Sequence, residues 1–155
     1  MTKGQTIFVT YSQVAVFQPD LENPFNNWLP SHVLQGFSWR PGSVTFMTLE
    51  EDGDLRVKLQ VKEHFDALYE DTTRAIRVPF NVVSGQIEVA SISEGFCANL
   101  PSGEYSLYFE TGKDNNGMWC ILSFVKDFIS QAEILKIDDD LHPGKELIMD
   151  TIPAL

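Results

Sequence analysis

The chain has 155 residues, and its 22 Asp and Glu against 11 Lys and Arg give it a net charge of −11. A surface of this charge repels phosphates and anionic lipids, and it attracts basic partners over a distance. Binding to duplex DNA draws most of its affinity from Lys and Arg, so we exclude nucleic acid as a direct ligand. The repulsion of anionic lipids likewise excludes a membrane surface. The favoured partner is a basic protein. Apolar residues make up 43% of the chain, which is ordinary for a single domain folded around a core.

The lack of a secretory signal or a membrane span makes the cytoplasm the default location. Residues 1–6 lead directly into strand-like sequence and lack the apolar core of a secretory signal. No segment approaches the roughly 20 consecutive apolar residues that span a bilayer. We therefore expect a cytoplasmic protein. In that reducing compartment Cys97 and Cys120 are expected to be small buried side chains rather than a disulfide.

The first predicted elements are an extended segment and a helix. Residues 5–11 and 13–17 are expected to form one long or bent strand. The only good candidate for a helix is Pro30–Gln35, which has Pro at its first position and is followed by a glycine that can cap it. Val33 and Leu34 of this helix are expected to face the core.

Alternation of apolar and polar residues predicts the next strands. In Leu55–Lys62 four apolar side chains point one way and four polar ones the other, as in a half-buried strand. The Asp-Gly sequence before it can adopt the positive φ of a tight turn, so we expect a hairpin with Ser43–Leu49. In Thr73–Val83, Pro79 has no N–H to donate, which predicts an edge strand or a bulge.

Further short strands follow at close spacing. They are expected at residues 87–92, 96–100, 104–111, 118–125 and 134–137. The strand at 118–125 is apolar on both faces, which is typical of a central strand. About eight short strands and one short helix near residues 30–35 predict an all-β fold, mainly an antiparallel β-sandwich. We expect this sandwich in residues 1–126, with residues 127–155 as an acidic C-terminal extension that packs on the same domain or trails from it.

The sequence contains no motif for catalysis or for a cofactor. There is no Gly-x-Ser-x-Gly elbow, and the glycines stand singly at turns rather than in a phosphate-binding loop. The three histidines are scattered, whereas zinc needs about four ligands at short spacing. We therefore expect a protein that is not an enzyme and that holds no cofactor or metal.

Acidic runs are the remaining candidates for a site. They are Glu50, Glu51, Asp52 and Asp54; Glu70 and Asp71; and Asp138, Asp139 and Asp140. Such runs can be an ordinary solvated surface, an anionic patch for a basic partner, or a fragment of a metal site. They lack the Asp-x-Asp-x-Asp-Gly order of a calcium loop.

The aromatic residues are the basis for an alternative hypothesis about function. Most are expected in the core, since Trp and Phe at this density are usually buried. An exposed coplanar pair such as Trp39 and Tyr108 would instead favour a carbohydrate- or small-ligand-binding sandwich. A third alternative is a hydrolase with a pair of catalytic carboxylates, for which no acid, base or nucleophile can be named.

Two stretches of the sequence resemble the competence protein J family. Residues 11–20, Tyr-Ser-Gln-Val-Ala-Val-Phe-Gln-Pro-Asp, are similar to the Tyr-x-Gln-x-x-Val-Phe-Gln-x-Asp opening of that family. Residues 78–88 and 100–107 are similar to its Val-Pro-Phe strand, its Gly-x-Ile turn and its Leu-Pro-x-Gly-x-Tyr-x-Leu segment. The resemblance covers about residues 7–125; this sequence departs from it by a longer loop around residues 113–117 and by the residues after Lys126, which do not align with the family.

This resemblance implies a small acidic protein that binds and blocks a non-specific, metal-dependent deoxyribonuclease. The charge agrees, because a nuclease site must attract phosphates and is therefore basic, and an acidic protein is steered toward it. The resemblance assigns no residue to the contact. From the charge pattern we expect the partner to bind the turn near residue 50 and the run near residue 139. These partner-binding residues are Glu50, Glu51, Asp52, Asp54, Asp138, Asp139 and Asp140.

Overall fold

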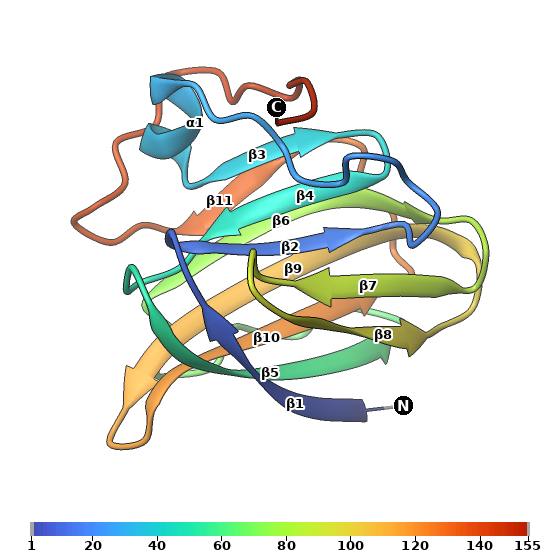
Figure 1. Cartoon of the computed structure of the whole chain (residues 1–155), viewed down its shortest axis with the longest axis horizontal. Helices are drawn as coiled ribbons and strands as arrows, with labels where there is room; N and C mark the ends of the chain where they lie inside the picture. The colour runs from blue at the N-terminus through green and yellow to red at the C-terminus, as the bar shows by residue number, and fades with distance from the viewer. Residues whose placement is uncertain (1, 155) are drawn as a thin grey trace.

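Two β-sheets packed face to face form the protein (Figure 1), in a computed structural model that describes residues 2–154. The six-stranded sheet has the order β1 (Thr2–Val9), β5 (Gly53–Lys62), β10 (Gly117–Val125), β9 (Gly103–Asp114), β6 (Arg74–Val82), β11 (Glu133–Lys136). The five-stranded sheet has the order β3 (Phe37–Arg40), β4 (Ser43–Met47), β2 (Gln13–Phe17), β7 (Gln86–Ala90), β8 (Gly95–Asn99). Neighbouring strands are antiparallel except β5 and β10. The prediction of an all-β antiparallel sandwich is confirmed, with more strands than expected.

The core lies between the two sheets. Alternate side chains of β5 point into it, as the pattern in Leu55–Lys62 predicts, and Leu55, Val57 and Leu59 are all buried there. Phe46 of the five-stranded sheet stacks on Phe109 of the six-stranded sheet with ring centroids 4.4 Å apart. β10 lies between β5 and β9, so its prediction as a central strand is confirmed.

The predicted hairpin between residues 43–49 and 55–62 is wrong. β4 pairs with β2 and β3, whereas β5 pairs with β1 and β10 in the other sheet. The turn between them is therefore an arch that carries the chain from one sheet to the other. A glycine with positive φ, here Gly53 at 133°, occurs in an arch as well as in a hairpin. The local sequence therefore does not distinguish the two kinds of turn.

The predicted single strand at residues 5–17 is also two strands in two sheets. Tyr11 and Ser12, with φ of 59° and 58°, turn the chain from β1 into β2. This second arch lies against the first one, because the Ser12 N–H donates to the Glu51 carbonyl (2.8 Å) and the Thr48 N–H donates to the Ser12 carbonyl (2.9 Å). Both crossings are thus at the same end of the sandwich.

The helix α1 (Pro30–Gln35) forms as predicted, with a left-handed glycine after its last residue. With six residues, it is too short to cross a membrane, and it is the only α-helix in residues 2–154. Its predicted orientation is wrong, because Val33 and Leu34 are each 45% exposed while His32 and Gln35 are buried. The reason is hydrogen bonding: His32 Nε2 donates to the Asp150 carbonyl (3.0 Å) and Gln35 Nε2 to the Ile148 carbonyl (3.0 Å).

The segment after β10 contacts the six-stranded sheet and the end of α1. β11 pairs with β6 at Ala75–Arg77, and the buried Leu141 packs against Gly36. Because β11 is so short, Pro79 lies in a part of β6 that has a strand on one side only, in agreement with the edge position predicted for it.

The two cysteines have different surroundings. Cys120 of β10 is buried, as predicted, and burial raises the pKa of its thiol. Cys97 of β8 is exposed, contrary to the prediction, and no disulfide joins the two residues. β8 is an edge strand, and Cys97 is on the face opposite the core residues Phe96 and Ala98.

Candidate partner-binding surface

Two of the acidic runs lie at the same end of the sandwich, the left end in Figure 1. Arg74, at the start of β6, connects them: its Nη1 donates to the carbonyl of Met47, just before the arch, and its Nη2 donates to Asp138 (2.7 and 2.8 Å). The turn between β9 and β10 joins the same end, because Lys113 Nζ lies 3.6 Å from Glu50 Oε1. We call this end, with its carboxylates at 50–54 and 138–140, the acidic end.

The arch at residues 50–54 exposes all of its carboxylates. Glu50, Glu51, Asp52 and Asp54 are each exposed to solvent. The one cation that approaches them within the described residues is Lys113, and an exposed pair of this kind contributes only about 0–1 kcal/mol. In the part of the chain that the structure describes, no ion pair neutralises the other three carboxylates. The arch therefore presents uncompensated negative charge.

Asp138 has a different environment from its neighbours in the sequence. Its carboxylate, 13% exposed, accepts two hydrogen bonds from the fully buried guanidinium of Arg74, from Nε at 3.2 Å and from Nη2 at 2.8 Å. Asp140 lies 3.9 Å from the same guanidinium but is largely exposed, and Asp139 is also exposed. Asp138 therefore neutralises a buried cation, and the charge that this run offers to a partner comes from Asp139 and Asp140.

Asp114 is a carboxylate that the sequence analysis missed. It lies at the end of β9 and, with the exposed Glu70 and Asp71, lines a cleft of about 350 Å³. The Arg56 guanidinium donates a hydrogen bond to it (2.6 Å), as does the backbone N–H of Asn116 (2.8 Å), and these bonds hold the pKa of Asp114 below its ordinary value. The contact with Arg56 joins residues far apart in the chain, so no local pattern indicates it.

Trp39 and Tyr108 do not form the exposed coplanar pair that would favour a carbohydrate site. Tyr108 is buried under Phe65, with the two rings stacked at 4.0 Å. Trp39 is half-buried in the other sheet and its Nε1 donates to the Pro79 carbonyl (2.8 Å). Tyr108 is thus buried, whereas Trp39 keeps part of its surface exposed; because the two residues lie in different sheets, they do not form the coplanar pair on which the alternative function depends.

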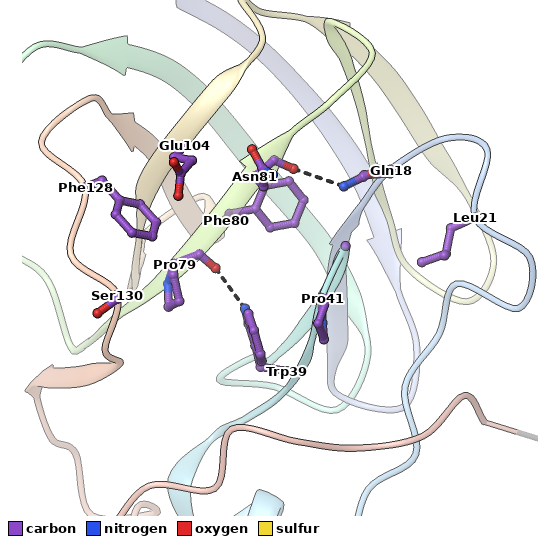
Figure 2. Close-up of a pocket in the computed structure, with 11 residues that line it drawn as sticks. Gln18, Leu21, Trp39, Pro41, Pro79, Phe80, Asn81, Glu104, Phe128 and Ser130 are labelled. Carbon is purple, nitrogen blue, oxygen red and sulfur yellow. Dashed lines mark hydrogen bonds between the residues drawn. The ribbon is translucent and has the colours of Figure 1, made fainter.

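A cleft of about 420 Å³ lies beside Trp39 (Figure 2). Its apolar walls include Leu21, Pro41 and Phe128, and Asn81 and Glu104 are at its rim. β6 and β9 each run from the acidic end, at Arg74 and Asp114, to this cleft, so the two features are at opposite ends of the strands. In residues 2–154 there is no group of three or more His, Cys, Asp or Glu placed to bind a metal.

The family model of Competence protein J (ComJ) matches residues 6–125, and the chain belongs to this family, as the resemblance in its sequence predicts. A relative, the DNA-entry nuclease inhibitor of Bacillus subtilis (strain 168), is 26% identical over 106 residues, which cover 68% of this chain and 78% of the relative. The arch at residues 50–54 lies inside the matched region, and the run at 138–140 lies outside it.

Solved structures share the fold. One is the crystal structure of ComJ from Bacillus subtilis, described as an inhibitor of the DNA degrading activity of NucA, with a TM-score of 0.68, 23% identity, and coverage of 80% of this chain and 95% of that one. Another, named Crocagin biosynthetic gene J, has a TM-score of 0.51 at 12% identity and covers 79% of this chain and 97% of that one. At these identities the structures establish a common fold.

Proposed function

We propose that this protein binds a non-specific deoxyribonuclease and inhibits it by covering its DNA-binding site with the acidic end. The observation that carries the proposal is the arch at residues 50–54, where four exposed carboxylates face solvent with a single Lys nearby. Its family and a relative described as a DNA-entry nuclease inhibitor support the same conclusion.

The physical basis is competition between carboxylates and phosphates for the same cations. A nuclease needs a positive site to hold DNA, and an acidic surface of complementary shape fits that site. The net charge of −11 also steers the protein toward a basic partner before contact. Inhibition of this kind needs no reaction on the inhibitor itself, so we expect no enzymatic activity.

The test begins with affinity capture from the source cells at low salt, followed by mass spectrometry and purification of the nuclease that is retained. Plasmid digestion by that nuclease is then measured with increasing amounts of this protein. We expect digestion to stop near equimolar protein, and the binding to weaken as salt is raised, because screening at high ionic strength reduces surface electrostatics. Undiminished digestion at molar excess and low salt would contradict the proposal.

The proposal also places the protein in the cytoplasm. Fractionation of the source cells with an antibody against the protein checks this location separately from inhibition.

A further inference from the structure

A partly exposed apolar patch lies at the acidic end. It consists of the exposed Tyr11, Leu29 and Val33 and the half-buried Trp28 and Met47, and all of these except Leu29 line a recess of about 240 Å³. Tyr11 is 71% exposed, Leu29 53% and Val33 45%. Leu29 caps the N-terminus of α1, where its carbonyl accepts a hydrogen bond from the Val33 N–H (3.3 Å), so the two residues are adjacent at the start of the helix.

The apolar patch has one carboxylate run on each side. On one side, the Ser12 N–H donates to the carbonyl of Glu51, which places Tyr11 directly beside the arch at residues 50–54. On the other side, the His142 N–H donates to the carbonyl of Leu34 (2.8 Å), which places the run at 138–140 beside α1. In Figure 1, the turn between β1 and β2, α1 and both acidic segments are together at the left end.

The backbone holds Tyr11 away from the core. Tyr11 and Ser12 have consecutive left-handed conformations, which are unfavourable for residues that carry a Cβ. The two hydrogen bonds to the neighbouring arch stabilise this turn. The phenol ring is consequently in solvent, although Val9 and Val14 on either side of the turn are fully buried.

An apolar centre with a charged rim is the usual anatomy of a protein–protein interface, and Tyr and Trp are enriched among the side chains that dominate binding. We propose that the apolar patch is the centre of the nuclease-binding surface, with Tyr11 as its anchoring side chain and the two carboxylate runs as its rim. This inference rests on the proposed function. It specifies the partner as a nuclease face in which Lys and Arg border an apolar pocket.

The two parts of such a surface act on different rate constants. Rim charges mainly set the association rate, whereas a desolvated anchor mainly sets the dissociation rate. The experiment is therefore a kinetic measurement on a biosensor, with the purified nuclease from the capture experiment immobilised. We expect Tyr11→Ala to raise the dissociation rate by about 30-fold and Val33→Ser by about 10-fold, with association changed by less than about 3-fold.

Two variants control the measurement. Tyr11→Phe keeps the ring and is expected to stay within about 3-fold of the wild type, since most of the anchor's contact area is the ring. Phe128→Ala removes an aromatic ring that is 40% exposed at the Trp39 cleft, at the opposite end of the strands, and is expected to leave both rates unchanged. Urea unfolding of each variant confirms that the fold is intact.

The outcomes separate this inference from the proposed function. If the wild type inhibits the nuclease but Tyr11→Ala and Val33→Ser dissociate at the wild-type rate, the inference is wrong and the function stands. If Phe128→Ala speeds dissociation and Tyr11→Ala does not, the Trp39 cleft is the contact and the inference is again wrong. If the wild type inhibits no captured nuclease, the function fails and the inference fails with it.

Discussion

The two acidic runs at one end of the sandwich have different roles, although they look alike in the sequence. The arch at residues 50–54 keeps its carboxylates in solvent, and within the described residues only Glu50 has a cation nearby. In the run at 138–140 the first carboxylate is bound to a buried guanidinium and the next two are exposed. Neighbouring acidic residues in a sequence therefore need not act together, because a buried cation can bind one carboxylate and leave the others exposed.

The cause of the difference is the position of Arg74. It begins β6 with no exposed area, and moving a guanidinium out of water costs several kcal/mol unless a counterion and hydrogen-bond acceptors replace the solvent. Asp138 and the Met47 carbonyl provide them. Toward the arch, Arg74 donates only to the backbone carbonyl of Met47, and in the described residues it forms no ion pair with an arch carboxylate, so those carboxylates are available to a partner.

The largest expected effect is on stability, and it tests the role of Asp138. We expect Asp138→Ala to lower the free energy of unfolding by about 3–5 kcal/mol, because it removes both hydrogen bonds from a carboxylate to the buried Arg74 guanidinium and leaves only the exposed Asp140 near it, at 3.9 Å. Asp139→Ala, one residue away on the exposed surface, is expected to change it by less than about 0.5 kcal/mol. Urea unfolding followed by circular dichroism measures both values.

A double variant sharpens this test. Arg74→Met with Asp138→Leu removes both charges, and replacing a buried ion pair by apolar residues is often neutral. We expect it to regain most of the stability that Asp138→Ala loses. Equal stability of Asp138→Ala and Asp139→Ala would show that the two positions do not differ as the structure indicates.

The second prediction concerns the rate of binding and the arch. Changing Glu50 and Glu51 to Gln, and Asp52 and Asp54 to Asn, removes four negative charges and should slow association with the nuclease by about 10- to 100-fold at low salt. The dissociation rate should change by less than about 3-fold, and the difference in association should shrink at high salt. Stopped-flow mixing at two ionic strengths measures these rates. An unchanged association rate at low salt would remove the arch from the interface.

The exposed members of the other run should have a smaller effect of the same kind. Asp139→Asn with Asp140→Asn removes two charges at the rim, and we expect association to slow by about 2- to 5-fold without loss of stability. The same stopped-flow measurement applies. If association of this double variant were slower than that of the fourfold arch variant, the run at 138–140 would contribute more to association than the arch does. The main contact would then lie outside the region that matches the family.

Local patterns in the sequence predict most of the strands but not their pairing, and they miss β3 and the break between β1 and β2. Alternation predicts β5 and apolar content predicts the central β10, because each depends on how one strand is buried. The arch before β5 was predicted as a hairpin, because a turn with a positive-φ glycine has the same sequence in both cases. Which sheet receives β5 is decided by its neighbours β1 and β10, which are distant in the chain.

The same limit applies to the candidate site. The two carboxylate runs could be named from the sequence, but their proximity depends on Arg74, whose burial no local pattern indicates. Val33 and Leu34 were expected in the core because apolar residues on a short helix are usually buried. The polar His32 and Gln35 are buried instead because they bind carbonyls of residues 148–150, a contact that spans most of the chain.

The smallest expected effect concerns Asp114. This carboxylate is exposed, like those of the arch, and it is paired with an arginine, like Asp138. The hydrogen bonds from Arg56 and from the Asn116 N–H lower its pKa in the folded protein, so ionised Asp114 stabilises the fold above its unfolded pKa, and this contribution is lost as the pH falls through the lowered value. Because the group is exposed, solvent screening keeps the contribution small. Titration of the carboxyl carbon shift by NMR should show the pKa of Asp114 rising toward its ordinary value in Arg56→Gln, with little change in the urea midpoint. A pKa unaffected by that substitution would mean that the ion pair does not persist in solution, and Asp114 would then belong with the uncompensated carboxylates of the arch.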